Sequence, residues 1–243
     1  MLIAVIGDIH GNVDALWAVL DVLDRLAVDD IICAGDVVGY GGAPGECIDL
    51  VRGRNFPCVK GNHDAYVVNP EIMSVAVREE AANVINWTRS ALSVEQIEWL
   101  DALPSFLDYE DFQVTHASNQ PFPEWHYILS PRRAAMHFLF QRKPLSFTAH
   151  SHVPLLGMHQ PGRRVTLELF RNLILPSKVS VMVGVGAVGQ PRDHDPRASA
   201  MLYDTDKRSV SILRVKYDVA AAQNRIREAG LPESLASRLE WGQ

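Results

Sequence analysis

Histidine, aspartate and asparagine side chains recur in this sequence directly after short apolar runs. They occur in the segments GDIHGN (7–12), GDVVGYG (35–41), GNHD (61–64), VTHAS (114–118) and AHSH (149–152). The candidate metal ligands in these segments are Asp8, His10, Asp36, Asn62, His116, His150 and His152. Mixed imidazole, carboxylate and amide ligands favour Mn, Fe, Zn, Co or Ni over Ca. The set therefore predicts a site for one of these divalent metals.

The number of candidate ligands indicates the chemistry of such a site. Seven ligands are more than one ion needs. They fit two ions that lie about 3.5–4 Å apart and share a bridging carboxylate. Two such ions would clamp a phosphoryl group and lower the pKa of a shared water, giving hydroxide near neutral pH. Taken singly, Asp8 is typical of a helix N-cap, GNHD of a turn and His116 of a core histidine. Their joint occurrence favours the metal site.

The elements that must position these residues follow from the hydrophobic pattern. Apolar strands expected at 2–6, 30–34 and 56–60 alternate with amphipathic helices expected at 13–26 and 44–53. This alternation predicts a parallel sheet that is buried on both faces. Because the carboxyl ends of parallel strands form the ligand crevice of an open α/β sheet, we expect the polar segments to meet there.

The remaining chain predicts further strands and helices. Strands are expected at 112–117 and 145–149, and two mostly helical segments within 71–101. A helix at 130–140 would begin with Ser130 as N-cap, and a helix at 217–230 would end at Gly230 as C-cap, followed by a short helix after Pro232. Short β-runs indicate a second sheet packed on the first, and lie at 153–159, 163–170, 178–186, 198–204 and 209–215. We expect one domain over 1–243, with the helical segment 217–243 packed on it.

Composition limits the classes of partner. A formal net charge of −6 argues against a protein that binds duplex nucleic acid through a basic surface, but it allows a small phosphorylated substrate. The apolar start MLIAVIG is too short for a signal peptide or a membrane span, so no membrane partner is expected. Cys33, Cys47 and Cys58 lack metal-type spacing and are interpreted as reduced thiols of a cytoplasmic protein. A homo-oligomer is possible, but the sequence does not indicate one.

Taken in order, these motifs resemble the calcineurin-like metallophosphoesterase superfamily, with its GDxHG, GDxxxxG, GNHD, later His and GHxH signature. The resemblance implies a layered α/β/β/α sandwich of two mixed sheets flanked by helices, with a dinuclear metal site at the C-terminal ends of strands. It implies one metal on Asp8, His10 and His152, a bridging Asp36, and a second metal on Asn62, His116 and His150. It also implies that His63 contacts the phosphate and assists the leaving group, while Asp64 orients His63.

Part of the chain resembles a small bacterial and archaeal phosphodiesterase-like branch of that superfamily, through GAVGQPRDHDPRASAML (186–202). The match makes Arg192 and Asp193 candidate substrate-binding residues, with Arg192 as a phosphate fork; a surface ion pair of Arg192 with Asp193 or Asp195 is the alternative. Tyr40 is expected at the mouth of the site. Two departures from the family pattern, Ala149 for glycine and GVGA (184–187) for NPGS, remove no ligand.

The aromatic segment 121–128 follows the His116 loop. Trp125, His126 and Tyr127 in this segment would form either a lid, a wall on which a base stacks, or ordinary core packing.

The expected function is therefore that of a metal-dependent phosphoesterase. It would hydrolyse a phosphomonoester or phosphodiester of a small, nucleotide-like substrate by in-line attack of a hydroxide shared by two metals. Hydrolysis of a dinucleoside polyphosphate such as diadenosine tetraphosphate is the alternative. A non-catalytic interaction scaffold of the same fold is disfavoured because the ligand set and His63 are complete.

Overall fold

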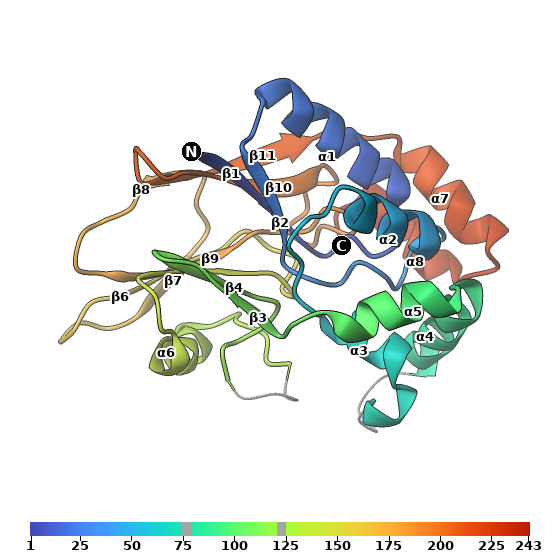
Figure 1. Cartoon of the computed structure of the whole chain (residues 1–243), viewed down its shortest axis with the longest axis horizontal. Helices are drawn as coiled ribbons and strands as arrows, with labels where there is room; N and C mark the ends of the chain where they lie inside the picture. Colours follow the sequence, from blue (N-terminus) through green and yellow to red (C-terminus); the bar gives the residue numbers. More distant parts are fainter. Residues whose placement is uncertain (74–78, 121–124) are drawn as a thin grey trace.

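Two mixed β-sheets packed face to face form the centre of the computed structural model, and helices cover their outer faces (Figure 1). The structure describes residues 1–73, 79–120 and 125–243. One sheet has the strand order β2-β1-β10-β11-β8 and the other β3-β4-β5-β9-β6-β7. The pairs β1–β2, β4–β5 and β5–β9 are parallel and the others antiparallel, which confirms the predicted sandwich of two mixed sheets.

The strands are short, and several end directly before the polar segments. They are β1 (Leu2–Ile6), β2 (Asp30–Cys33), β3 (Phe106–Asp108), β4 (Phe112–Thr115), β5 (Leu145–Thr148), β6 (Leu156–His159), β7 (Thr166–Glu168), β8 (Asn172–Ile174), β9 (Ser180–Gly184), β10 (Ala198–Asp204) and β11 (Ser209–Val215).

The helices lie between and after these strands. They are α1 (Val13–Leu26), α2 (Pro44–Gly53), α3 (Asn62–Val68), α4 (Glu79–Ala91), α5 (Val94–Ala102), α6 (Pro131–Phe140), α7 (Val219–Glu228) and α8 (Glu233–Ser237), with 3₁₀ turns at Pro70–Ile72 and Arg238–Glu240. Among the described residues, no helix combines the length and the apolar character needed to cross a membrane.

Local sequence signals set the ends of several helices. The Asn12 side chain caps α1 by accepting from the Ala15 amide at 3.1 Å, and the C-cap residue Ala27 has a left-handed backbone. Ser130 caps α6 by accepting from the Arg133 amide, as predicted. The C-cap of α7 is Ala229, and the predicted Gly230 follows it with a φ of +69°.

The predicted strand at 56–60 is reduced to a single bridge between Cys33 and Cys58, and that expectation was wrong. Pro57 has no amide hydrogen to donate, so it can only accept, as its carbonyl does from the Cys33 amide. The late β-runs are divided between the two sheets, because β6, β7 and β9 lie in the sheet of β3, β4 and β5. Strands β10, β11 and β8 extend the sheet of β1 and β2, since β10 pairs with the remaining edge of β1.

Apolar side chains fill both interfaces of this layered structure. Val5, Phe147 and Met201 belong to the cluster between the two sheets, while Leu16 and Leu20 of α1 pack on the outer face of the β1 sheet. Burial of this apolar surface from water is the dominant stabilising term. The sheets are thereby held so that their loops meet at one edge.

The C-terminal segment packs on this layered core. Helix α7 lies against α1, where Arg225 Nε donates to Asp14 Oδ2 at 2.9 Å. The backbone near the end of the chain contacts the loop before β10, because the His194 amide donates to the Gly242 carbonyl at 2.9 Å. The segment therefore closes over the same side of the sheet as α1 (Figure 1).

Candidate metal centre

The loops that follow β1 and β2 are tied together by backbone hydrogen bonds. The Asp8 amide donates to the Gly35 carbonyl at 3.0 Å, and the His10 amide donates to the Asp36 carbonyl at 2.9 Å. The His150 amide, from the loop after β5, donates to Asp8 Oδ1 at 3.2 Å. These bonds bring segments from both sheets to one position.

Several candidate ligands have strained backbones. Left-handed φ angles occur at Asp8 (50°), His10 (50°), Asp36 (54°), His150 (64°) and His152 (58°). Non-glycine residues rarely adopt this region, and such strain persists where the surrounding structure enforces it, typically at functional sites. The geometry turns these side chains sharply out of their strand ends and towards one another.

The candidate ligands gather into buried clusters that could hold metal ions. In each of the groups Asp8–His10–His152 and Asp36–His116–His150, one ligand atom per residue lies within 4.8 Å of the others. The first group would be joined to the second by Asp36, because Asp36 Oδ2 is 3.6 Å from His10 Nε2 and 3.3 Å from His116 Nε2.

Asn62 adds an amide oxygen to the second group. Its Oδ1 lies 3.1 Å from His116 Nε2. Asn62 is also the first residue of α3, which starts directly after its N-cap residue Gly61. The structure thus brings all seven predicted ligands to one location.

Backbone carbonyls orient most of the imidazoles. Nδ1 of His10 lies 3.1 Å from the Val38 carbonyl, Nδ1 of His116 lies 2.8 Å from the Ala34 carbonyl, and Nδ1 of His152 lies 2.6 Å from the Gln190 carbonyl. If these nitrogens donate, Nε2 of each ring is left as a metal ligand, the usual arrangement for histidine ligands. His150 is reversed, with Nε2 3.1 Å from the Trp125 carbonyl, which leaves Nδ1 as the ligand.

The donor set fits a bound cation. Burial lowers the pKa of His10, His150 and His152, that of His150 to about 3, so these rings are neutral and able to coordinate. Asp8 Oδ2 is buried and has no hydrogen-bond partner among the described residues. His10 Nε2 and His152 Nε2 face each other at 3.1 Å, as two ligands of one ion would.

The pKa values of the buried carboxylates of Asp8 and Asp36 depend on each other and on the neighbouring histidines. Burial raises the pKa of Asp8 to about 8, and the neighbouring Asp36 adds to the rise. Burial also opposes ionisation of Asp36, but the facing His116, among other rings, outweighs it and holds the pKa of Asp36 well below its usual range. A divalent cation would favour ionisation of both carboxylates.

His63 lies beside the clusters without being fixed by Asp64. One of its ring nitrogens lies within 4.8 Å of ligand atoms of His10 and Asp36, and its Nδ1 has no hydrogen-bond partner among the described residues. Burial lowers the pKa of His63 to about 4. The side chain therefore points a neutral imidazole at the site.

Asp64 has contacts that differ from those implied by the resemblance. Its oxygens accept from the backbone amides of Gly61, Asp36, Val37 and Val38 at 2.8–3.3 Å, and not from the His63 ring. Asp64 is the third residue of α3, so its side chain folds back to cap that helix and the loop that carries Asp36. Burial raises the pKa of Asp64 to about 7, which the amide donors oppose because they favour the carboxylate.

Tyr40 and Arg192, the candidate substrate-binding residues, lie beside the metal centre. The Tyr40 ring is 4.7 Å from the His10 ring and 4.4 Å from the His63 ring. The guanidinium of Arg192 lies 5.8 Å from the centre of the Tyr40 ring, and its Nη2 donates to Gln190 Oε1 at 2.8 Å. Arg192 therefore does not pair with Asp193 or Asp195, which were the alternative partners.

Asp193 is engaged elsewhere. Its carboxylate forms an ion pair with Arg214 of β11, and it lines a separate cavity with Pro154 and Arg171. The ion pair engages Oδ2, and Asp193 belongs to none of the His/Asp clusters of the described residues, so the geometry gives its predicted substrate contact no support.

Ala149 and the GVGA segment are accommodated without loss of a ligand. Ala149 is not among the residues with positive φ; the strain lies at His150 and His152 on either side of Ser151. The Ala149 methyl group faces Gly7, where an added side-chain carbon would come within 2.9 Å of it. In GVGA, Ser199 Oγ fills the space beside Gly186 and donates to the Val185 carbonyl at 3.0 Å.

The predicted lid segment falls partly outside the described residues, since 121–124 are not described. The described part reaches the site: the Tyr127 ring stacks on His150 at 3.9 Å and the Trp125 ring lies 5.7 Å from His116. Sequence reasoning missed the carbonyls that orient the histidines, because the orienting group is the backbone and leaves no trace in residue type. The GQPR motif was the one signal that pointed to Gln190.

Two buried His/Asp clusters on a two-sheet α/β sandwich define the metallophosphoesterase class of protein. The sequence model of the calcineurin-like phosphoesterase superfamily domain matches residues 1–208, and the chain belongs to that superfamily. It is 39% identical to a metallophosphoesterase from Sphaerobacter thermophilus, whose crystal structure matches with a TM-score of 0.86 over 100% of both chains.

Curated relatives are similar over different lengths. An uncharacterized protein of Methanocaldococcus jannaschii is 34% identical over 99% of this chain and 98% of that protein. A symmetrical bis(5′-nucleosyl)-tetraphosphatase of Vibrio campbellii is 28% identical over 48% of this chain and 44% of that protein.

Proposed function

We propose that the protein is a metal-dependent phosphoesterase that hydrolyses phosphomonoester or phosphodiester bonds of a small, nucleotide-like substrate. The position of Asp36 Oδ2 carries this proposal, because it lies within 3.6 Å of His10 Nε2 and 3.3 Å of His116 Nε2, one from each cluster. A carboxylate in that position suits two ions, as two-metal phosphoesterase chemistry requires.

The residues would divide between two ions. Asp8, His10 and His152 would hold one ion and Asn62, His116 and His150 the other, with Asp36 shared. Ions such as Mn, Fe, Zn, Co or Ni would, when bound, polarise the phosphoryl group and lower the pKa of a coordinated water.

The remaining site residues would act directly on the substrate. His63 contacts the phosphate; the bound anion would favour protonation of the ring, which then gives its proton to the departing oxygen. Arg192 supplies a cation whose guanidinium pairs with phosphate oxygens, and Tyr40 forms the wall between Arg192 and His63. Asp64 supports this arrangement indirectly by fixing the backbone of the Asp36 loop.

The substrate is a small phosphorylated molecule and not duplex nucleic acid, given the acidic net charge. The three buried, free cysteines agree with a cytoplasmic protein. A dinucleoside polyphosphate is the second candidate substrate; the observation that favours it is the similarity to the Vibrio tetraphosphatase over about half the chain. A scaffold role without catalysis is disfavoured by the complete ligand set.

A substrate panel tests the proposal. Metal-stripped protein would be loaded with Mn²⁺, Ni²⁺, Co²⁺ or Zn²⁺ and assayed on p-nitrophenyl phosphate, bis(p-nitrophenyl) phosphate, cyclic nucleotides and diadenosine tetraphosphate. We expect turnover of a monoester or a diester with at least one metal. Turnover of diadenosine tetraphosphate well above the others would select the second candidate, and no turnover of any substrate would refute the proposal.

A further inference from the structure

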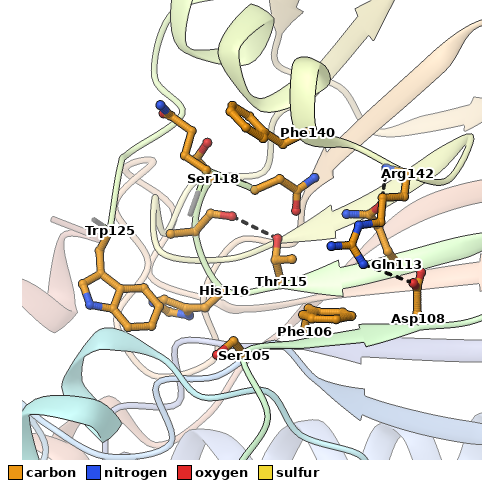
Figure 2. A pocket seen from close by; sticks show the side chains of 13 residues that line it. Ser105, Phe106, Asp108, Gln113, Thr115, His116, Ser118, Trp125, Phe140 and Arg142 are labelled. Atoms are coloured by element: carbon orange, nitrogen blue, oxygen red, sulfur yellow. Dashed lines mark hydrogen bonds and ion pairs between the residues drawn. The ribbon is translucent and has the colours of Figure 1, made fainter. Parts of the chain in front are cut away.

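A cavity of about 560 Å³ opens beside the metal centre on the outer side of the β3–β4 pair. This volume lies within the range of about 300–1,000 Å³ typical of small-molecule sites. Its aromatic side chains are Phe106 of β3, Phe140 of α6 and Trp125. In Figure 2, Phe140 and Phe106 lie on opposite sides and Trp125 lies at one end. We call this cavity the aromatic pocket.

The polar groups of the aromatic pocket are mostly uncharged amides and hydroxyls. Gln113 Oε1 accepts from the backbone amides of Arg142 and Lys143 at 2.7 and 3.1 Å, so its amide nitrogen is directed away from them and has no partner among the described residues. Ser118 Oγ and Gln120 Oε1 are likewise unpartnered in the described chain, but both atoms are buried from solvent, so the Gln113 amide is the group that faces the open cavity. Buried polar groups are normally satisfied, so a ligand with hydrogen-bonding heteroatoms fits here.

The charged groups of the pocket neutralise one another. Arg142 lies at the end opposite Trp125 (Figure 2), 4.0 Å from Asp108, and its guanidinium is 5.0 Å from the Phe106 ring. Apart from His116, which belongs to the metal centre, the remaining lining residues carry no basic side chain that would hold a phosphate. The pocket therefore fits an uncharged, planar, heteroatom-rich group.

The inner end of the pocket reaches the metal centre. His116 lines the pocket and belongs to the Asp36–His116–His150 cluster. Trp125 places its ring 5.7 Å from the His116 ring, and its carbonyl lies 3.1 Å from His150 Nε2. A phosphoester held at the metal centre could thus extend its organic part into the pocket.

We propose that the aromatic pocket binds the base of a nucleoside that forms part of the substrate, a role that rests on the proposed phosphoesterase function. The base stacks between aromatic rings, and the Gln113 amide nitrogen donates to one of its ring or exocyclic acceptors. Stacking on aromatic side chains tolerates different bases because every base has a π-face. The substrate class is accordingly nucleotide esters, with the phosphate at the metals and the base in the pocket.

Binding of adenosine and thymidine, which carry no phosphate, tests the pocket apart from catalysis. Saturation-transfer NMR on protein in EDTA would measure nucleoside binding by the wild type and two variants. Phe106→Ala removes a stacking wall of the pocket, and Ser105→Trp fills its space. Both altered residues are exposed, so the variants should fold, as circular dichroism would check. We expect nucleoside affinity to fall about tenfold or more in both, and to stay unchanged in Leu139→Ala, an exposed α6 control outside the pocket.

A kinetic comparison adds the link to the substrate. Thymidine 5′-p-nitrophenyl phosphate and methyl p-nitrophenyl phosphate have the same charge and leaving group, so their kcat/KM ratio isolates the nucleoside. The ratio should favour thymidine in the wild type and fall in Phe106→Ala. If the wild type does not bind the nucleosides, the proposed base-binding role of the pocket is wrong, even if both esters are hydrolysed. The role is also wrong if neither variant changes nucleoside binding or the kcat/KM ratio. Nucleoside binding without hydrolysis of any ester would instead refute the phosphoesterase.

Discussion

The proposed role of His63 is to act on the phosphate and not to bind a metal. Its ring lies beside His10 and Asp36 but is not needed to complete either of the two proposed ligand sets. Burial lowers the pKa of His63 to about 4, and a bound phosphate anion would raise it, so that the ring could carry the proton that the leaving group takes.

Replacing His63 should therefore impair catalysis but not metal binding. In His63→Gln, we expect kcat to fall by about 10²–10⁴, the usual contribution of general acid–base catalysis. Steady-state kinetics and metal analysis of the same sample would measure both quantities. Full activity in this variant would exclude the proposed role of His63.

Arg192 should contribute binding more than chemistry. Because charge-assisted hydrogen bonds are worth about 1.5–3 kcal/mol, Arg192→Gln should raise KM for the dianionic p-nitrophenyl phosphate by about tenfold or more. The rise should be smaller for the monoanionic bis(p-nitrophenyl) phosphate. Arg197→Gln is the control, since Arg197 pairs with Asp195; equal effects of the two substitutions would contradict a phosphate contact by Arg192.

At the residue scale, the sequence predicts side-chain types better than contacts. The seven ligands were predictable because each follows an apolar run and their ligand chemistry is shared. The contacts of Asp64 were not, because an aspartate at the third position of a helix can turn to backbone amides as readily as to a neighbouring imidazole. The ion pair of Asp193 with Arg214 joins residues that are distant in sequence, and no local pattern reveals it.

At the element scale, the loop after β2 leaves room for the His63 ring because Gly39 has no side chain. Gly39 has a φ of +95°, and an added Cβ would lie 2.4 Å from His63 Nδ1. Gly39→Ala should therefore displace His63 and strain the loop, at a cost of roughly 1 kcal/mol or more in the free energy of unfolding. We expect kcat to fall about tenfold or more, since small misplacements of catalytic groups are costly.

Gly53 provides a matched control for Gly39. It lies in helix α2, and nothing lies within 4 Å of a Cβ added there. Gly53→Ala should raise the free energy of unfolding by about 0.5–1 kcal/mol and leave kcat unchanged. If Gly39→Ala behaved like Gly53→Ala in kinetics and chemical denaturation, the loop would not position His63.

Helix α6 holds the loop after β4 through a buried histidine. His137 Nδ1 accepts from the Asn119 amide at 3.2 Å, and burial lowers the pKa of His137 to about 3. The unfolded imidazole titrates near 6.5, so between these values the unfolded chain binds more protons and the native state loses stability as pH falls. From pH 7 to pH 5, this residue should cost about 2 kcal/mol of stability.

The variant His137→Gln should remove that part of the pH dependence. Denaturant unfolding of metal-free protein at pH 7 and pH 5 would give the difference between variant and wild type. A loss of stability on acidification that is identical in both proteins would show that His137 does not contribute it. Other buried histidines with lowered pKa values should still make the free energy of unfolding of the variant depend on pH.

The elements themselves were predictable in part. Helices α1 and α6 were predicted because the periodicity of both and the Ser130 cap of α6 are local signals. The strand at 56–60 failed because Pro57 cannot donate to a ladder. Which sheet the late strands join was not predictable, since pairing of β10 with β1 depends on residues about 200 positions apart.

At the scale of the whole molecule, the metal centre lies where the two sheets meet. Asp8, His10 and Asp36 come from loops after strands of one sheet, while His116, His150 and His152 come from loops after strands of the other. Ions bound there would connect the sheets and stabilise the fold, by about 2.7 kcal/mol for one ion at 100 times its Kd.

The measurement that tests the central claim most directly is hydrolysis of bis(p-nitrophenyl) and p-nitrophenyl phosphate while Mn²⁺ is titrated into metal-stripped protein. We expect no turnover without metal and a rate that rises until about two ions are bound per chain, as expected for a two-metal site. An equal rate before and after stripping, or no hydrolysis at any metal content, would contradict a metal-dependent phosphoesterase.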